Sequence, residues 1–297
     1  MIRKEQAMDT KDLEKLIAEI IQEKYPADQN KKEAAETVAV KSDESIPDIR
    51  SIDYTQFSLV ENPANPEEFL RIRKQTDARI GIGRCGSRYK TQPYLRLLAD
   101  HAGALDAVRN EPPAELIEKN ELYPVQTLCE NKDVYMTRPD LGKLFTEETL
   151  AAMRKDCVSA PDVQIIASEG LSSTALERNI TDLLAAINQG ISAQGLKAGT
   201  PIYVKYSRVP AMDVITENLK SKVTIMLIGE RPGLSTYESL SAYMTYEGYV
   251  GIPESKRTVI SNIHSNGTIP SEAGALIAEV AQKMLESKAS GTDLKLY

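Results

Sequence analysis

The sequence predicts an α/β protein, in which a C-terminal doubly wound, Rossmann-like domain of three layers follows a mostly helical N-terminal region. Three observations support this prediction. From Asp162 onward, apolar runs alternate with segments of helical periodicity, as in a βαβ array. The runs are continuously apolar, which is typical of strands that helices cover on both faces. Upstream, residues 62–157 are mostly helical by pattern, with only short β-like pieces between the helices.

Four regions follow from these patterns. Residues 1–25 contain an amphipathic helix, because Leu13, Leu16, Ile17, Ile20 and Ile21 recur at helical spacing. Residues 26–60 form a polar, flexible linker. So short a helix cannot bury its own apolar stripe, and we expect it to dock on the chain's own body, a partner or an assembly surface. Residues 61–158 form a mostly helical, partner-contacting domain, and residues 159–297 form the α/β domain.

Individual elements are predicted from apolar periodicity and from flanking turn residues. In the middle domain, helices are expected at 67–75, 93–101, 104–108, 115–120 and 147–155, and a β-like piece at 134–137. In the C-terminal domain, strands are expected at 163–167, 201–206, 223–228, 243–246 and 258–263, and helices at 174–194, 212–220 and 271–288.

Composition excludes several classes of function. A net charge of -7 argues against a nucleic-acid partner, and no apolar run is long enough to cross a membrane. The three cysteines lack paired C-x-x-C spacing, which indicates reduced thiols in a cytoplasm. With only two histidines, a zinc site or a histidine-based triad is disfavoured, and we expect neither a metal ligand nor a catalytic residue in this chain.

Gly81, Gly83 and Gly86 spell G-x-G-x-x-G, the pattern of a dinucleotide-binding turn. That turn needs a buried strand before it, whereas residues 71–80 are highly charged. We therefore expect a basic, glycine-rich loop that faces a partner or solvent. An NAD-dependent oxidoreductase remains an alternative.

The C-terminal sheet offers better candidates, because ligands of such sheets lie beyond the carboxyl ends of the strands. Three loops there, 168–173, 207–210 and 229–233, are rich in small and turn-forming residues. Within the last loop, glycines flank Glu230-Arg231-Pro232, which favours close approach to a ligand, with Glu230 as an acceptor. An ordinary surface turn is the alternative. Serines 168, 172 and 173 have no neighbouring base in sequence, so a serine nucleophile is not expected.

The two histidines are interpreted as structural. His264 stands in Asn262-Ile263-His264-Ser265-Asn266-Gly267, which nearly matches the D-x-H-x-x-G signature of cobalt-ligating histidines. Asn262 replaces the aspartate that would orient the imidazole, which favours a structural histidine. His101 is expected at the end of a helix, where the helix dipole would favour a protonated ring.

At this point the sequence resembles a known family. The matching stretches run from about residue 97 to residue 291: LLADHAGALDAV, YMTRPDLG, DVQIIASEGLSSTA, GLKAGTPIYVKYSRV, VTIMLIGERPGL, ESLSAY, RTVISNIH and KMLESKASG. In this order they are similar to the small (light) subunit of ethanolamine ammonia-lyase.

The resemblance implies a subunit of an adenosylcobalamin-dependent lyase that converts ethanolamine to acetaldehyde and ammonia. In that family the large subunit carries the substrate site and the radical chemistry, and the small subunit holds cobalamin at the interface. The N-terminal helix resembles the tails that direct the family into bacterial microcompartments, which implies a cytoplasmic location within such a compartment and contact with its shell or cargo. A non-catalytic regulatory module that binds cobalamin or a nucleotide is the alternative.

The resemblance also implies cofactor contacts at three positions of this chain. They are Val209 after Tyr-Ser-Arg, Glu230 of G-E-R-P-G, and Val259 after Arg-Thr. Val259 replaces a cysteine of other members, so a role that requires a thiol at this position is not expected. The family leaves the cofactor's own benzimidazole on cobalt, in agreement with the missing aspartate before His264.

Overall fold

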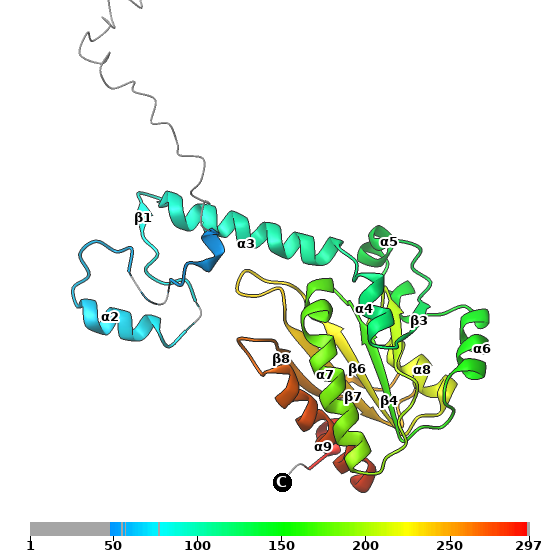
Figure 1. Ribbon diagram of the computed structural model, residues 1–297. Coiled ribbons are helices and arrows are strands. Elements are labelled where there is room, and N and C mark those ends of the chain that lie inside the picture. Colours follow the sequence, from blue (N-terminus) through cyan, green and yellow to red (C-terminus); the bar gives the residue numbers. More distant parts are fainter. Residues whose placement is uncertain (1–47, 55, 57, 77, 296–297) are drawn as a thin grey trace, which may run out of the picture. The chain divides into compact units, whose positions relative to one another are not determined.

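The computed structural model describes residues 48–54, 56, 58–76 and 78–295. Within them the chain forms an α/β fold around a six-stranded sheet of order β3-β5-β4-β6-β7-β8 (Figure 1). The strands are β3 (Tyr123–Gln126), β4 (Val163–Ser168), β5 (Ile202–Lys205), β6 (Val223–Gly229), β7 (Leu240–Tyr246) and β8 (Thr258–Ile263). Strands β3, β5, β4 and β6 are parallel, whereas β7 is antiparallel to β6 and to β8. The α/β prediction is confirmed as a mixed sheet with helices, and its doubly wound, Rossmann-like form stays a prediction.

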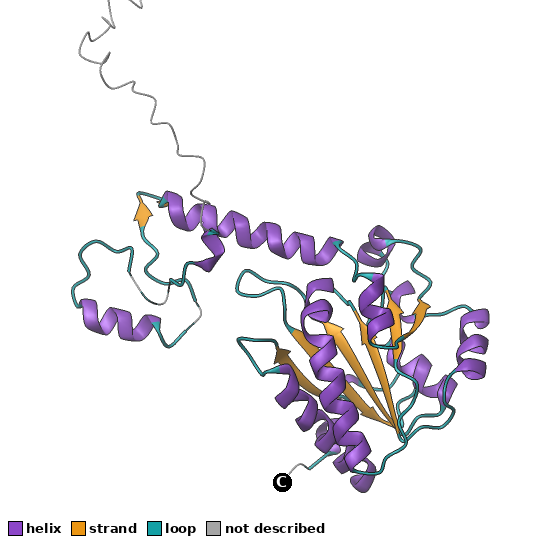
Figure 2. Cartoon of the chain, viewed as in Figure 1, coloured by secondary structure: helices purple, strands orange, loops and turns teal. Residues whose placement is uncertain are grey.

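Helices cover both faces of the sheet. Helices α7 (Ser173–Ala193) and α9 (Pro270–Ser287) pack on one face, where they lie in front of the orange strands in Figure 2. The opposite face is covered by α6 (Glu147–Asp156) and α8 (Ala211–Leu219). Successive strand residues alternate between the two sides: Ile165 packs with α7 and α9, and Ile166 packs with α6 and α8. The continuously apolar strands are explained by this double coverage.

Small residues let α7 and α9 approach closely. A methyl group at Gly190 would lie 2.4 Å from the Ala278 Cβ, and one at Gly274 would lie 2.5 Å from the Ala186 Cβ. These helix positions therefore accept only glycine without a shift of the two helices.

Besides β3 and α6, the described chain before β4 holds several further elements. They are the 3-10 helix η2 (Ile49–Ser51), α2 (Pro66–Arg73), the hairpin β1 (Arg84–Cys85) and β2 (Arg88–Tyr89), α3 (Thr91–Arg109), α4 (Ala114–Lys119), α5 (Lys132–Thr137) and the 3-10 helix η3 (Leu141–Lys143). Two further 3-10 helices lie in the C-terminal part: η4 (Glu254–Lys256) precedes β8, and η5 (Gly291–Asp293) follows α9.

Two sequence predictions in this region are wrong. Residues 134–137, expected to be β-like, belong to α5, because the Asn131 side chain caps that helix by accepting from the Val134 N–H at 3.0 Å. The two helices expected at 93–101 and 104–108 are one helix, α3, which runs through Gly103. His101 therefore lies exposed in the middle of this helix and not at its negative end.

Strand β3 had no counterpart in the sequence prediction. It is a four-residue edge strand that contains Pro124 and pairs with β5. It comes from the region expected to be mostly helical. The boundaries at residues 25, 60 and 158 stay predictions, and the amphipathic helix predicted at 10–25 lies outside the described residues. Among the described helices, none has both the length and the apolar character that a bilayer crossing requires.

Candidate functional site

A pocket of about 330 Å³ opens at the carboxyl ends of the parallel strands. It is formed by the loops that follow β4, β5 and β6, by the last two residues of β6, and by one residue each of α5 and β7. Its walls are Tyr135, Gly170, Leu171, Ser207, Arg208, Val209, Ile228, Gly229, Glu230, Arg231 and Tyr243. The three loops that sequence analysis selected thus meet at one place, as expected for an open α/β sheet.

Glu230 is held at the rim of this pocket by two serines. Its carboxylate accepts hydrogen bonds from the Ser239 hydroxyl at 3.1 Å and from the Ser241 hydroxyl. The Glu230 N–H donates to the Ser239 carbonyl at 3.0 Å. Both serines follow from the β6–β7 pairing, which places Ser241 opposite Ile228. The carboxylate is only partly buried, so it keeps lone pairs for a ligand's N–H or O–H group.

Val209 lies on the loop between β5 and α8. The loop is fixed by the Arg208 N–H, which donates to the Gly142 carbonyl at 2.7 Å, and by the Met212 N–H, which donates to the Val209 carbonyl at 3.1 Å. Val209 is half-buried against the core beneath α8 and presents apolar surface to the pocket.

Val259 is not among the residues that line the pocket. It lies on β8 directly opposite Tyr243 of β7, and its side chain is 45% exposed. Paired residues of neighbouring antiparallel strands point to the same face of a sheet. Val259 is therefore next to Tyr243, which does line the pocket. The structure brings Val209 and Glu230 into one pocket and places Val259 beside it.

Sequence analysis missed Glu169, a fully buried carboxylate one residue beyond β4. It accepts from the Tyr203 hydroxyl at 2.6 Å and from the Tyr206 N–H at 2.9 Å. Tyr206 has a positive φ of 59°, which is unfavourable for a residue other than glycine. Glu169 thus supports a strained turn three residues before Val209. Its place in the SEGLSS loop was visible in the sequence, but its partners were not.

Two cationic side chains have buried nitrogens without a hydrogen-bond acceptor among the described residues: the Nζ of Lys132, and the Nε of Arg208, which lines the pocket. The Lys132 amine lies 5.4 Å from the Tyr135 ring centre and 5.8 Å from that of Tyr206, and burial lowers its pKa. The Arg208 guanidinium lies 4.2 Å from the Tyr135 ring centre. Both cations thus lie over aromatic ring faces, and Arg208 also donates through Nη2 to the Tyr135 carbonyl at 2.9 Å.

The glycines of the pocket serve contacts between loops. A methyl group on Gly229 would lie 2.1 Å from the Ser172 carbonyl oxygen, and one on Gly170 would lie 2.3 Å from the Gly229 carbonyl oxygen. Gly229 therefore lets the ends of β4 and β6 touch, whereas sequence analysis assigned it to close approach of a ligand. A methyl group on Gly233 would make only an ordinary contact, 3.8 Å from the Thr236 carbonyl oxygen.

The three serines considered as nucleophiles have structural contacts. Ser172 caps α7 by accepting from the Ala175 N–H at 3.1 Å, and Ser173 donates to the Ala107 carbonyl at 3.1 Å. The Ser168 hydroxyl accepts from the Gly170 N–H at 3.3 Å. All three side chains are buried, and that none is a nucleophile stays a prediction.

His264 makes its hydrogen bonds within its own turn. Its Nδ1 accepts from the Asn266 N–H at 3.3 Å, so the proton lies on Nε2, 2.9 Å from the Asn262 side-chain oxygen. Both ring nitrogens are thus engaged within one turn. Among the described residues, no group of three or more histidine, cysteine or acidic side chains is arranged to hold a metal ion.

The G-x-G-x-x-G segment forms the β1–β2 hairpin and not a strand–turn–helix unit. Gly81 and Gly83 have positive φ, and a methyl group on Gly81 would collide with the Phe69 ring. These glycines are therefore explained by local packing. A second pocket of about 470 Å³ lies beside the hairpin.

Comparison with known proteins gives one consistent family. The model for the family "Ethanolamine ammonia-lyase light chain (EutC)" matches residues 66–295. The chain is 52% identical over 256 residues to the ethanolamine ammonia-lyase small subunit of Clostridium perfringens, which covers 86% of this chain and 87% of that protein. It is 46% identical over 295 residues to the small subunit of Lachnoclostridium phytofermentans, covering 97% and 100%. The small subunit of Listeria monocytogenes is 47% identical over 264 residues, covering 89% of each chain.

Proposed function

Because this chain belongs to the ethanolamine ammonia-lyase light-chain family, we propose that it binds adenosylcobalamin at an interface with a large catalytic subunit. The reaction of the assembled enzyme is the conversion of ethanolamine to acetaldehyde and ammonia. The observation that carries the proposal is the meeting of Val209 and Glu230 in one pocket at the carboxyl edge of the sheet.

The residues of the pocket fit the periphery of a corrinoid. That periphery carries amide side chains and methyl groups. The partly exposed Glu230 carboxylate offers acceptors to amide N–H groups, and Leu171, Val209 and Ile228 offer apolar surface. A pocket of about 330 Å³ holds only part of so large a ligand. The remainder has to be covered by another chain, which supports a site shared with the large subunit.

When bound, adenosylcobalamin supplies the radical that starts the reaction. The residues of this chain bind and orient it. Glu230 fixes one edge through hydrogen bonds, while Val209 and the neighbouring Val259 give apolar contact and exclude water from that edge. Glu169 accepts a hydrogen bond from the Tyr206 N–H and so helps to fix the position of the loop that carries Val209.

Replacement of Glu230 by glutamine tests this function. The amide keeps the size of the side chain but loses the charge and one acceptor. In the assembled enzyme, the Kd for adenosylcobalamin should rise by the equivalent of about 1–3 kcal/mol. Glu238→Gln in the same loop is the matched control and should leave the Kd unchanged. An unaltered Kd in the Glu230 variant would mean that Glu230 belongs to an ordinary surface turn and does not contact the cofactor.

The alternative function is a regulatory module that binds cobalamin or a nucleotide without catalysis. Assembly with the large subunit distinguishes the two functions. We expect the isolated chain to be inactive toward ethanolamine and to gain activity only with the large subunit. A chain that binds the cofactor but never forms an active complex with a large subunit would favour the regulatory module.

A further inference from the structure

The loop that joins β6 to β7, residues 230–239, carries Glu230 and has no helix or strand of its own. Its first residue is paired with Ser239 and Ser241, which belong to the same hairpin. Those contacts tie Glu230 to the loop. Farther along the loop, the Gly233 N–H donates to the Thr236 carbonyl at 2.9 Å, and Asn179 of α7 donates to the Glu238 carbonyl at 2.8 Å. The outer part of the loop has further contacts with more distant segments.

The outer part of the loop is held by residues from far upstream. Arg79 donates through Nη2 to the Leu234 carbonyl at 2.7 Å, and Arg50 donates through Nη1 to the Tyr237 hydroxyl at 3.1 Å. The Tyr237 ring packs on α3, where a methyl group at Gly103 would lie 2.8 Å from it. Segments that are 155 and 187 residues apart in sequence thus meet on this loop.

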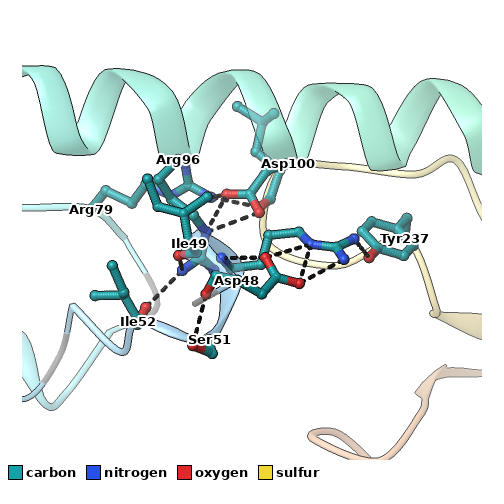
Figure 3. Close-up of polar contacts among 10 residues, drawn as sticks. Asp48, Ile49, Ser51, Ile52, Arg79, Arg96, Asp100 and Tyr237 are labelled. Atoms are coloured by element: carbon teal, nitrogen blue, oxygen red, sulfur yellow. Dashed lines mark hydrogen bonds and ion pairs between the residues drawn. The ribbon is translucent and has the colours of Figure 1, made fainter. Parts of the chain in front are cut away.

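Asp100 of α3 lies next to Arg79 and Arg96 (Figure 3). Its carboxylate is 7% exposed and pairs with Arg79 and Arg96, the latter through Nε at 2.8 and 3.0 Å. Arg96 also donates through Nη1 to the carbonyls of Ile49 and Ile52, at 3.2 and 2.6 Å. One buried carboxylate therefore orients Arg79, which contacts the loop directly, and Arg96, which fixes the segment that presents Arg50.

We propose that Asp100 is a positioning residue for the 230–239 loop and, through that loop, for Glu230. This inference rests on the proposed function, in which Glu230 contacts cobalamin. The physical reason is the strength of charge-assisted hydrogen bonds away from water. Without the carboxylate, two adjacent arginines repel each other, and the Arg79 side chain is free to leave the Leu234 carbonyl for solvent.

The test compares Asp100→Asn with Asp106→Asn, which makes the same charge change at an exposed position of α3. Hydrogen–deuterium exchange of the 230–239 peptide and the Kd for adenosylcobalamin are measured in the assembled enzyme. For Asp100→Asn we expect faster exchange of this peptide and a Kd raised about tenfold. Asp106→Asn should change neither.

A second variant covers the possibility that Asp100→Asn does not fold. Arg79→Gln leaves the Arg96–Asp100 pair in place and removes the charged contact to the loop, so it should also speed exchange of residues 230–239. A double variant then separates positioning from general destabilisation. On the Glu230→Gln background, loss of Asp100 should raise the Kd no further, because its effect passes through Glu230.

Unchanged exchange of the loop in both variants would overturn the inference. A second contradicting result would be a tenfold rise in the Kd for adenosylcobalamin on removal of Asp100 that persists in full on the Glu230→Gln background. Asp100 would then act on binding by a route other than Glu230. Failure of the proposed function has a different signature: the Kd would not respond to Glu230→Gln itself. Exchange of the loop would still decide whether Asp100 holds it.

Discussion

Glu169 connects two strand ends through one buried side chain. Both carboxylate oxygens accept hydrogen bonds, one from the Tyr203 hydroxyl and one from the Tyr206 N–H. Burial, and after it the charge of Glu169, raise the pKa of Tyr203. The carboxylate is thus part of the scaffold that carries Val209.

Replacement of Glu169 by glutamine should lower the free energy of unfolding by about 1–3 kcal/mol, because an amide offers one acceptor where two donors converge. Urea denaturation of this variant measures the loss. Glu177→Gln on the exposed side of α7 is the control and should stay within about 0.5 kcal/mol of the parent chain. Equal stabilities of the Glu169 variant and the parent would mean that water satisfies the Tyr206 N–H.

Glu111, whose carboxylate pairs with Lys205 and Tyr206, makes a contribution to the stability of the fold that depends on pH. The Lys205 amine, at 2.8 Å, and the Tyr206 hydroxyl lower the pKa of Glu111 below its ordinary value of 4.5. A carboxyl group with a lowered pKa in the folded state stabilises the fold above its unfolded pKa, and this stabilisation disappears as the pH falls through the folded pKa.

The Tm difference between the parent chain and Glu111→Gln should therefore be largest above about pH 5 and should close toward about pH 3. Thermal unfolding followed at several pH values measures it. Glu115→Gln, at an exposed position of α4, is the control. Its Tm difference from the parent chain should not close between about pH 5 and about pH 3. A gap for Glu111→Gln that widens on acidification would contradict the assignment.

At the scale of elements, the long and continuously apolar segments were the predictable ones. Strand β6 and helix α9 were expected within two residues of their observed bounds, since burial on both faces or along one stripe leaves a clear pattern. Helix α5 was misread because its six residues include Val134 and Tyr135, which favour strands in isolation. Strand β3 was missed because four residues with a proline carry almost no periodicity.

The contact between α7 and α9 is an element-scale prediction. Gly274→Ala would improve helix propensity by about 1 kcal/mol in an open helix. Here the added methyl group would meet Ala186 at 2.5 Å and the Leu183 carbonyl at 2.9 Å, so the helices must separate. We expect a net loss of about 1–3 kcal/mol in the free energy of unfolding, measured by chemical denaturation.

Ser271→Ala, at an exposed position of the same helix, provides the comparison for that experiment and should be nearly neutral. If Gly274→Ala were instead more stable than the parent chain, the two helices would have room that the structure does not show.

At the scale of the whole molecule, the prediction that stays to be tested is that residues 1–25 form a targeting helix, joined by a linker at 26–60 to the rest of the chain. Deletion of residues 1–25 should leave the activity of the assembled enzyme unchanged and release it from microcompartments. Fractionation of compartments with an ethanolamine deamination assay on each fraction measures both outcomes. Loss of activity with retained encapsulation would reverse the assignment.

The sequence by itself determined the family, the alternation of strands and helices after Asp162, and the three loops that meet at the carboxyl edge. These depend on local periodicity and on short residue patterns. Tertiary structure decided which side chains support the site. Glu169 reaches Tyr206 across 37 residues, and Arg79 reaches Leu234 across 155. Such partners are set by how the chain packs in space, and no spacing along the sequence encodes a hydrogen bond between segments so far apart.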